Sequence, residues 1–164
     1  MDVRSKQSIA SAFAQILADF GRLDVVVANA GVSYHYDALE MPEEKYREIM
    51  GVNVDGVWWT AQETGRIFKA QAEKVSAETK GSRGSFIVTG SVSATLVNLP
   101  QKQAVYNASK AAVVHLAKSL AVEWATWGGR VNTISPGYIE TESEFFLPAA
   151  SLFLVLLLPY VSLF

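Results

Sequence analysis

Three short apolar runs alternate with helical patterns along the first 135 residues of the chain. The runs are rich in β-branched residues and cover residues 23–28, 85–90 and 130–135. Each run ends in small or polar residues, as a buried parallel strand does where it stops at a loop. Because a helical pattern precedes every run, the order predicts an α/β fold in which a parallel sheet carries helices on both faces.

The helical patterns have recognisable ends. Apolar residues recur on one face of the first pattern, which begins at Ser5 as an N-cap and is followed by Gly21, where a terminating glycine belongs. Pro42 opens the second pattern, since proline is favoured in the first turn of a helix. The sequence therefore predicts three helices, which cover residues 5–20, 43–72 and 103–127.

The second helical pattern is interrupted at residues 51–56, where Asn53 stands between two glycines. Glycine and asparagine have low helix propensity, so a kink is expected at this point. When an asparagine occurs inside a helix, its local surroundings usually explain why. Here a backbone carbonyl freed by the kink could hold a water molecule.

Tyr106 and Lys110 stand four residues apart, which places both side chains on one face of a helix. The pKa of a tyrosine hydroxyl is about 10, so its use in proton transfer at neutral pH costs roughly 4 kcal/mol. A lysine ammonium about 4 Å away contributes a similar amount, roughly 4 kcal/mol at an effective dielectric constant of about 20. The pair is thus a candidate acid/base, and a serine at the end of the preceding strand could hold the substrate oxygen. The alternative is a pair on a solvated helix surface.

The composition excludes several classes of partner and site. A net charge of −2 argues against a nucleic-acid surface or an anionic membrane as the main partner. The chain has no cysteine, so disulfides and thiolate chemistry are excluded. Its two histidines, His35 and His115, lack the spacing of metal ligands, and no metal site is expected. The first residues lack the apolar core of a signal peptide, which predicts a cytoplasmic protein.

The last twenty residues, 145–164, are largely apolar and contain no charged residue. Their length would allow a membrane span, but Pro148 and Pro159 interrupt the segment and no basic flank follows it. A buried C-terminal tail is the favoured interpretation, and a membrane-anchored form is the alternative. Two regions are therefore expected, an α/β domain over residues 1–142 and an apolar tail over residues 143–164.

Four separated patterns together resemble one protein family. They are Asn29-Ala30-Gly31, Asn53 within Val52-Asn53-Val54-Asp55-Gly56, Ser91 ahead of Tyr106-x-x-x-Lys110, and Pro136-Gly137-Tyr138-Ile139-x-Thr141. In this order they resemble the short-chain dehydrogenase/reductase family, and the resemblance covers residues 1–142. Residues 97–103 and 116–124 are similar to its branch of fungal sorbose reductases and NADP-dependent mannitol 2-dehydrogenases.

This resemblance implies a Rossmann-like domain with four catalytic residues. Tyr106 would be the general acid in reduction, and Lys110 would stabilise its phenolate and bind the nicotinamide ribose. Ser91, which directly follows its strand as the family serine does, would hold the carbonyl oxygen in preference to Ser93. Asn53 would anchor a water molecule in the proton relay.

The implied cofactor is NADP, with NAD as the alternative. The resemblance places three groups of residues along this cofactor, in addition to Tyr106 and Lys110. They are Asp2 and Val3 beside the adenine, Asn29, Ala30 and Gly31 along the adenosine side, and Pro136, Gly137, Ile139 and Thr141 at the nicotinamide.

One family feature is missing from the sequence, a Gly-rich strand-to-helix turn that seats a pyrophosphate on a helix N-terminus. Asp2 and Val3 resemble the end of the family's third strand, so we expect a partial doubly wound sheet that lacks the first βα units. The implied function is NADP(H)-dependent reduction of a keto-sugar or similar carbonyl to an alcohol, with a small carbonyl or polyol as substrate. The alternative is a catalytically inactive family fragment or an interaction module.

The four tryptophans fall on two of the predicted helices, over residues 53–72 and 103–127. Aromatic residues are enriched at interfaces, and the resemblance implies that these helices pair across a two-fold axis in a homo-oligomer. Packing against the sheet is the alternative. The residues concerned are Trp58, Trp59, Trp124 and Trp127.

Overall fold

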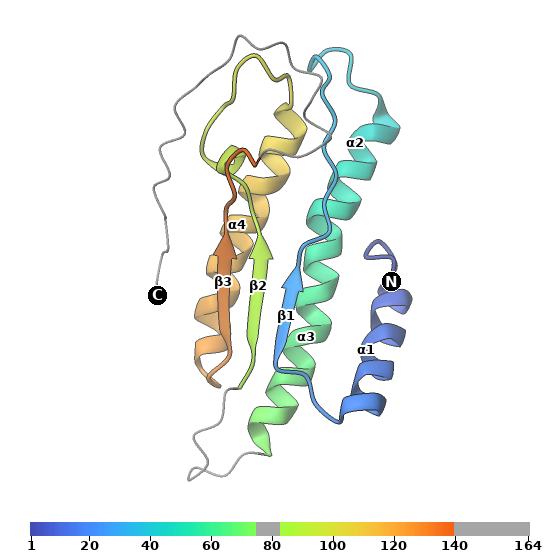
Figure 1. Cartoon of the computed structure of the whole chain (residues 1–164), viewed down its shortest axis with the longest axis vertical. Coiled ribbons are helices and arrows are strands. Elements are labelled where there is room, and N and C mark those ends of the chain that lie inside the picture. Colours follow the sequence, from blue (N-terminus) through green and yellow to red (C-terminus); the bar gives the residue numbers. More distant parts are fainter. Residues whose placement is uncertain (75–82, 140–164) are drawn as a thin grey trace.

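The computed structural model describes residues 1–74 and 83–139, in which helices and strands alternate as the sequence predicts (Figure 1). Thr141 and the tail predicted at 143–164 lie outside the described residues. Within the described part of the chain, no helix combines the length and apolar character that a bilayer crossing requires. The elements are α1 (Lys6–Phe20), β1 (Val25–Ala28), α2 (Glu43–Met50), a π-helical turn (Gly51–Asp55), α3 (Gly56–Glu73), β2 (Ser85–Thr89), a 3₁₀ turn (Val92–Ala94), α4 (Ala104–Ala125) and β3 (Arg130–Ile134).

The described strands form one parallel sheet in the order β1–β2–β3. β2 lies in the centre, where Phe86 is in register with Val26 of β1 and with Val131 of β3. Parallel neighbours need a crossover connection, which the helices α3 and α4 provide. The carboxyl ends of the strands therefore meet at one edge of the sheet, the upper edge in Figure 1.

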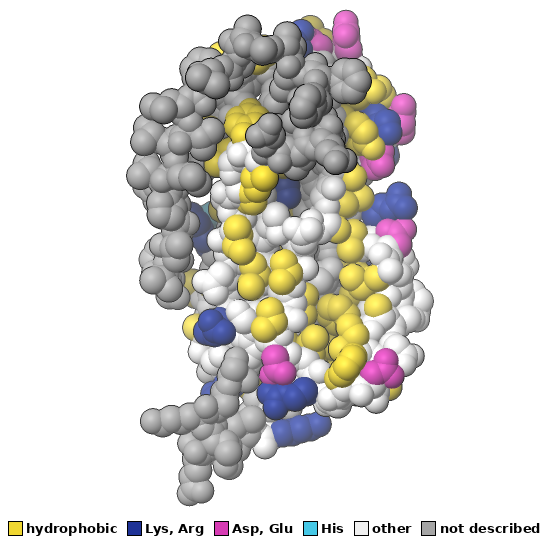
Figure 2. Space-filling model, in the orientation of Figure 1, with side chains coloured by type: hydrophobic (Ala, Val, Ile, Leu, Met, Phe, Trp, Pro, Cys, Tyr) yellow, Lys and Arg dark blue, Asp and Glu magenta, His cyan; other side chains and the backbone are white. Residues whose placement is uncertain are grey.

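Among the described residues, the helices cover one face of this sheet. Val26 and Ala28 point into the core that β1 shares with α1, α3 and α4, whereas Val25 and Val27 are 55% and 53% exposed. Successive side chains of a strand point to opposite faces, and Figure 2 shows hydrophobic side chains over the strands on the uncovered face. The sequence predicts helices on both faces and a fully buried first strand. In the described residues β1 is buried on one face only, because the helices all lie on that side.

Trp124 on α4 is part of the core near the amino ends of the strands. Its indole is 7% exposed, and its ring centroid lies 5.7 Å from that of Phe86 and 6.3 Å from that of Phe68. These contacts join α4 to β2 and to α3. Core packing, the alternative considered for the tryptophans, is therefore correct for Trp124.

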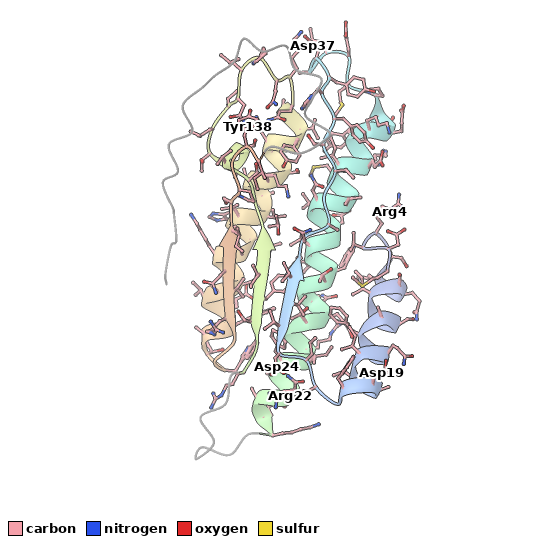
Figure 3. The ribbon with its side chains drawn as sticks, in the orientation of Figure 1. Arg4, Asp19, Arg22, Asp24, Asp37 and Tyr138 are labelled. Carbon is pink, nitrogen blue, oxygen red and sulfur yellow. The ribbon has the colours of Figure 1, made fainter. Side chains whose placement is uncertain are left out.

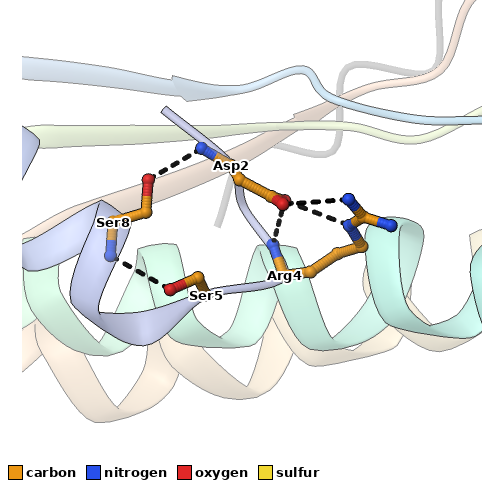
Figure 4. Close-up of polar contacts among 4 residues, drawn as sticks. All are labelled: Asp2, Arg4, Ser5 and Ser8. Atoms are coloured by element: carbon orange, nitrogen blue, oxygen red, sulfur yellow. Dashed lines mark hydrogen bonds and ion pairs between the residues drawn. The ribbon is translucent and has the colours of Figure 1, made fainter.

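Both ends of α1 form as the sequence predicts. The Ser5 hydroxyl oxygen accepts a hydrogen bond of 3.2 Å from the backbone N–H of Ser8 (Figure 4). At the other end Gly21 takes a left-handed conformation with φ of 73°, and its N–H donates to the Leu17 carbonyl at 2.9 Å. These bonds satisfy backbone groups that a helix leaves unpaired at its ends.

The predicted kink between α2 and α3 is the π-helical turn Gly51–Asp55, which contains Asn53. The N–H of Gly56 donates to the carbonyl of Gly51, five residues before it. A turn of this kind inserts one residue into the helix and breaks the regular i to i−4 bonding. The helix axis thus continues from α2 to α3 while the backbone around Asn53 departs from α-helical geometry.

Replacement of Phe68 with alanine should destabilise the protein strongly. The ring is 0% exposed, and truncation of a buried phenylalanine leaves a cavity that costs about 3–5 kcal/mol of unfolding free energy. Denaturant titration followed by circular dichroism measures this loss. The control is Phe20→Ala on α1, where the side chain is 75% exposed and the change should stay within about 0.5 kcal/mol. Equal losses in the two variants would contradict the described core.

Candidate active site

Hydrogen bonds between the loops hold the carboxyl ends of the strands together. The Thr89 hydroxyl at the end of β2 donates to Asn29 Oδ1, just beyond β1, at 3.0 Å. On the other side, the N–H of Val92 donates to the carbonyl of Pro136, beyond β3, at 3.0 Å. The sequence-predicted residues that follow the three strands are thus brought to one edge of the sheet, next to the first turns of α4.

Lys110 on α4 carries a buried ammonium group at this edge. The residue is 5% exposed, and its Nζ donates to the carbonyl oxygen of Thr89 at 2.8 Å. Burial lowers the pKa of Lys110. Nζ lies 5.7 Å from the centroid of the Tyr106 ring, so the spacing of four residues does place the two side chains together on one face of the helix.

Asn53 is 1% exposed, and every hydrogen-bonding position of its side-chain amide except one oxygen lone pair is used. Its Oδ1 accepts from the N–H of Val32 at 2.8 Å. Its Nδ2 donates to the carbonyl of Val32 and to the hydroxyl of Ser109, both at 3.0 Å. The side chain therefore joins the π-helical turn to the loop after β1 and to α4.

Gly31 passes close to both of these groups. A Cβ atom placed on Gly31 would lie 3.4 Å from Lys110 Nζ and 3.5 Å from Asn53 Oδ1. A side chain at this position would therefore occupy the space beside the buried ammonium. The absence of a side chain at Gly31 therefore lets its backbone approach Lys110 and Asn53 closely.

The two serines that follow β2 have different surroundings. Ser93 Oγ accepts hydrogen bonds from Asn98 Nδ2 at 2.9 Å and from Gln103 Nε2 at 3.2 Å, so both of its acceptor positions are used within the loop. Ser91 Oγ accepts one bond of 3.1 Å from the N–H of Ser93. This bond uses Ser91 Oγ as an acceptor and does not use its O–H donor. The contacts of Ser93 were not expected from the sequence, because its two partners lie 5 and 10 residues further along the chain.

Three loops meet at the upper end of the molecule, where Figure 3 shows Asp37 and Tyr138. Lys102 Nζ donates to the Asp37 carboxylate at 2.8 Å, and this hydrogen bond lowers the pKa of Asp37. The Tyr138 hydroxyl donates to Gln101 Oε1 at 2.7 Å. Sequence reasoning missed both contacts, because residues 65 and 37 positions apart carry no local signal of their proximity.

Val3, Asn29 and Ala30 line a cavity of about 100 Å³ beside the end of β1. Asp2, in contrast, is not among the lining residues and pairs with Arg4, whose Nη2 lies 2.9 Å from Asp2 Oδ2 (Figure 4). The hydrogen bond from the Arg4 side chain lowers the pKa of Asp2 to about 2. Of the two residues predicted at the adenine, Val3 therefore lines the cavity, whereas Asp2 forms an ion pair with Arg4.

The residues predicted at the nicotinamide follow β3. Pro136 and Gly137 are half-buried beside the 3₁₀ turn, where a Cβ atom on Gly137 would lie 3.8 Å from Val92 Cγ1. Ile139 is 64% exposed. Residues 1–74 and 83–139 contain no group of three His, Cys, Asp or Glu side chains that could hold a metal ion.

Comparison with known sequences shows that the chain is similar to fungal reductases and dehydrogenases. A family model described as enoyl-(acyl carrier protein) reductase matches residues 1–153. An L-xylulose reductase of Hypocrea jecorina is 47% identical over 155 residues, which are 90% of this chain and 54% of that protein. A sorbose reductase of Candida albicans is 44% identical over 144 residues, 86% of this chain and 47% of that protein. The chain spans about half the length of the curated relatives that it matches.

Solved structures show the same fold over a similar share of their length. An NADPH-dependent 3-quinuclidinone reductase from Rhodotorula rubra is 43% identical with a TM-score of 0.74, covering 85% of this chain and 49% of that one. A gluconate 5-dehydrogenase from Burkholderia cenocepacia, in complex with NADP and tartrate, is 30% identical with a TM-score of 0.75, covering 87% and 51%. The Rossmann-like α/β fold predicted from the sequence is confirmed.

The buried ammonium should make stability depend on pH. Lys110 has a lower pKa in the folded protein than its ordinary value of 10.5, so the unfolded chain binds more protons between these two pKa values. The unfolding free energy of the wild type, relative to that of Lys110→Met, should therefore increase as the pH is raised from about 7 toward about 10. Denaturant titrations of both proteins across this range measure the difference. A difference that stays constant or decreases would contradict the desolvation of Lys110.

Proposed function

Because the chain belongs to the short-chain dehydrogenase/reductase family, as its sequence patterns predict, we propose that it reduces a carbonyl group to an alcohol. One observation supports this proposal above the others. The Lys110 ammonium is buried, is anchored on the Thr89 carbonyl and lies next to the Tyr106 ring. A pair on a solvated helix surface would show none of this burial.

Tyr106 is the proposed proton donor. Its hydroxyl would transfer a proton to the carbonyl oxygen as that oxygen gains negative charge, and the Lys110 ammonium would stabilise the phenolate that remains. Ser91 would donate a hydrogen bond to the same oxygen. The side chain of Asn53 is bound within the protein, so its role in the relay would fall to its backbone carbonyl, which would hold a water molecule.

A nicotinamide cofactor fits the residues at the carboxyl edge of the sheet. The close approach of the Gly31 backbone to Lys110 and the cavity beside β1 support this assignment. Lys110 and Tyr106 would hold the nicotinamide ribose, and residues 29–31 with Val3 would hold the adenosine side. No pyrophosphate contact is assigned, because the sequence has no Gly-rich turn. When bound, the reduced cofactor supplies a hydride to the carbonyl carbon.

We propose NADP as this cofactor and a keto-sugar as the substrate. A relative from Yarrowia lipolytica, 39% identical to this chain, is named a probable NADP-dependent mannitol dehydrogenase. Two further relatives are named for the sugars L-xylulose and sorbose.

We also propose a homo-oligomer that forms through α3 and α4. Trp58 on α3 is 38% exposed, and partly exposed aromatic side chains of this kind are enriched at interfaces. Trp124 does not support this proposal, since it packs in the core.

Light scattering of the purified protein at micromolar concentration should give the mass of a dimer or a larger assembly. Replacement of Trp58 with glutamate should shift the measured mass toward that of the monomer.

Tyr106→Phe should abolish carbonyl reduction and leave cofactor binding in place. The substitution removes only the hydroxyl, and loss of a general acid costs about 10²–10⁴-fold in rate. Consumption of NADPH with L-xylulose or sorbose measures turnover, and quenching of protein fluorescence by NADPH measures binding.

The matched control is Tyr46→Phe on α2, where the side chain is 46% exposed at the surface. This variant should keep the wild-type rate. Retention of most of the rate in Tyr106→Phe would reject its role as proton donor, and absence of NADPH-dependent turnover in the wild type would reject the proposed function itself.

A further inference from the structure

Ser109 lies in the helix between Tyr106 and Lys110, and it is 0% exposed. Its hydroxyl donates to the backbone carbonyl of Tyr106 at 2.7 Å. Because this bond uses the only hydrogen of the hydroxyl, the oxygen can act toward Asn53 only as an acceptor. The bond of 3.0 Å from Asn53 Nδ2 has this direction.

The direction of this bond also decides how the amide of Asn53 is oriented. Its nitrogen must face Ser109, so its oxygen must face the N–H of Val32, which donates to it at 2.8 Å. The second hydrogen of the amide nitrogen goes to the carbonyl of Val32 at 3.0 Å. Asn53 therefore holds both backbone groups of Val32, and the Ser109 hydroxyl accepts the remaining amide hydrogen in the same orientation.

These bonds close a ring of contacts around the space beside the ammonium. From Ser109 on α4 the ring passes through Asn53 and Val32 to Gly31, where a Cβ atom would lie 3.4 Å from Lys110 Nζ. Lys110 is the residue that follows Ser109 on the same helix. The hydroxyl of Ser109 is thus linked, through Asn53 and Val32, to the backbone at Gly31 beside the group that is proposed to bind the ribose and to act on Tyr106.

A serine in a helix often bonds only to a carbonyl of the preceding turn, and such a bond contributes little to stability. Ser119 on the outer side of α4 is an example, since its hydroxyl donates to the His115 carbonyl at 3.3 Å and has an exposed position. Ser109 differs because its oxygen also accepts a hydrogen bond from Asn53, which belongs to the π-helical turn.

We propose that Ser109 is a positioning residue, which acts through Asn53 to hold the backbone beside Lys110 in the arrangement that carbonyl reduction requires. This inference rests on the proposed function for its effect on turnover. Its structural part, the orientation of Asn53 by Ser109, holds whether or not the chain turns over a substrate.

The test is Ser109→Ala, with Ser119→Ala as the matched control on the same helix. In the first variant, one amide hydrogen of Asn53 loses its acceptor in a buried place. We expect kcat to fall about 10-fold or more with KM for the carbonyl substrate changed by less than about 3-fold. Ser109→Thr, which keeps the hydroxyl, should restore kcat, and Ser119→Ala should leave it unchanged.

A second readout needs no turnover. In nuclear magnetic resonance spectra of the wild type, the side-chain amide hydrogens of Asn53 should exchange slowly with solvent, since both are bonded and buried. Ser109→Ala should speed up the exchange of one of them at least about 10-fold, and Ser109→Thr should not. If Ser109→Ala fails to fold, Ser109→Thr decides alone, because loss of slow exchange in that variant would overturn the proposal.

Unchanged kcat together with unchanged exchange in Ser109→Ala would overturn the inference and leave the proposed function standing. Absence of turnover in the wild type would instead overturn the proposed function. The exchange measurement would then still test whether Ser109 holds Asn53. In the double variant Ser109→Ala with Asn53→Ala, kcat should equal that of Asn53→Ala alone, because Ser109 acts through Asn53. Losses that multiply would contradict this route.

Discussion

The parallel pairing of β2 with both of its neighbours decides where the candidate chemistry lies. All three strands end at the same edge, and the loops that follow them meet there. Thr89 is the last residue of β2, so its carbonyl lies where the ladder ends and needs a donor from elsewhere. The ammonium of Lys110, which burial deprives of water, needs acceptors. Their bond of 2.8 Å satisfies both groups, and it fixes α4 over the end of the sheet.

The polar residues around this bond are buried at a cost that hydrogen bonding offsets. Asn53 and Ser109 are almost completely buried, and their bonds to each other, to Val32 and to Tyr106 use every hydrogen that their side chains can donate. By contrast, the side-chain oxygens of Thr64 and Asn107 are buried without a hydrogen-bond partner among the described residues. An unsatisfied group of this kind costs about 1–3 kcal/mol. The completeness of the Asn53 and Ser109 bonds therefore distinguishes an organised polar cluster from polar side chains that packing merely encloses.

Local sequence predicted the elements well, because their signals act over a few residues. The cap at Ser5 and the left-handed glycine at Gly21 depend on backbone groups within four residues. The two glycines around Asn53 predicted the irregular turn for the same reason, although not that it is a π-helical turn. The spacing of Tyr106 and Lys110 predicted a shared helix face, since that geometry is set within one turn of helix. The exposure of Val25 and Val27 was missed, because burial on both faces requires layers that local sequence does not specify.

The sequence by itself determined the order and type of the elements, the resemblance that identifies the family, and the residues proposed for catalysis. Only the tertiary structure decided how these residues are held. It showed that Lys110 is anchored on a backbone carbonyl, that Trp124 belongs to the core, and that Asn53 donates a hydrogen bond to Ser109 across 56 residues of sequence. The physical reason is that a hydrogen bond or a packing contact between distant segments depends on the path of the whole chain between them. No spacing or composition within either segment records that path.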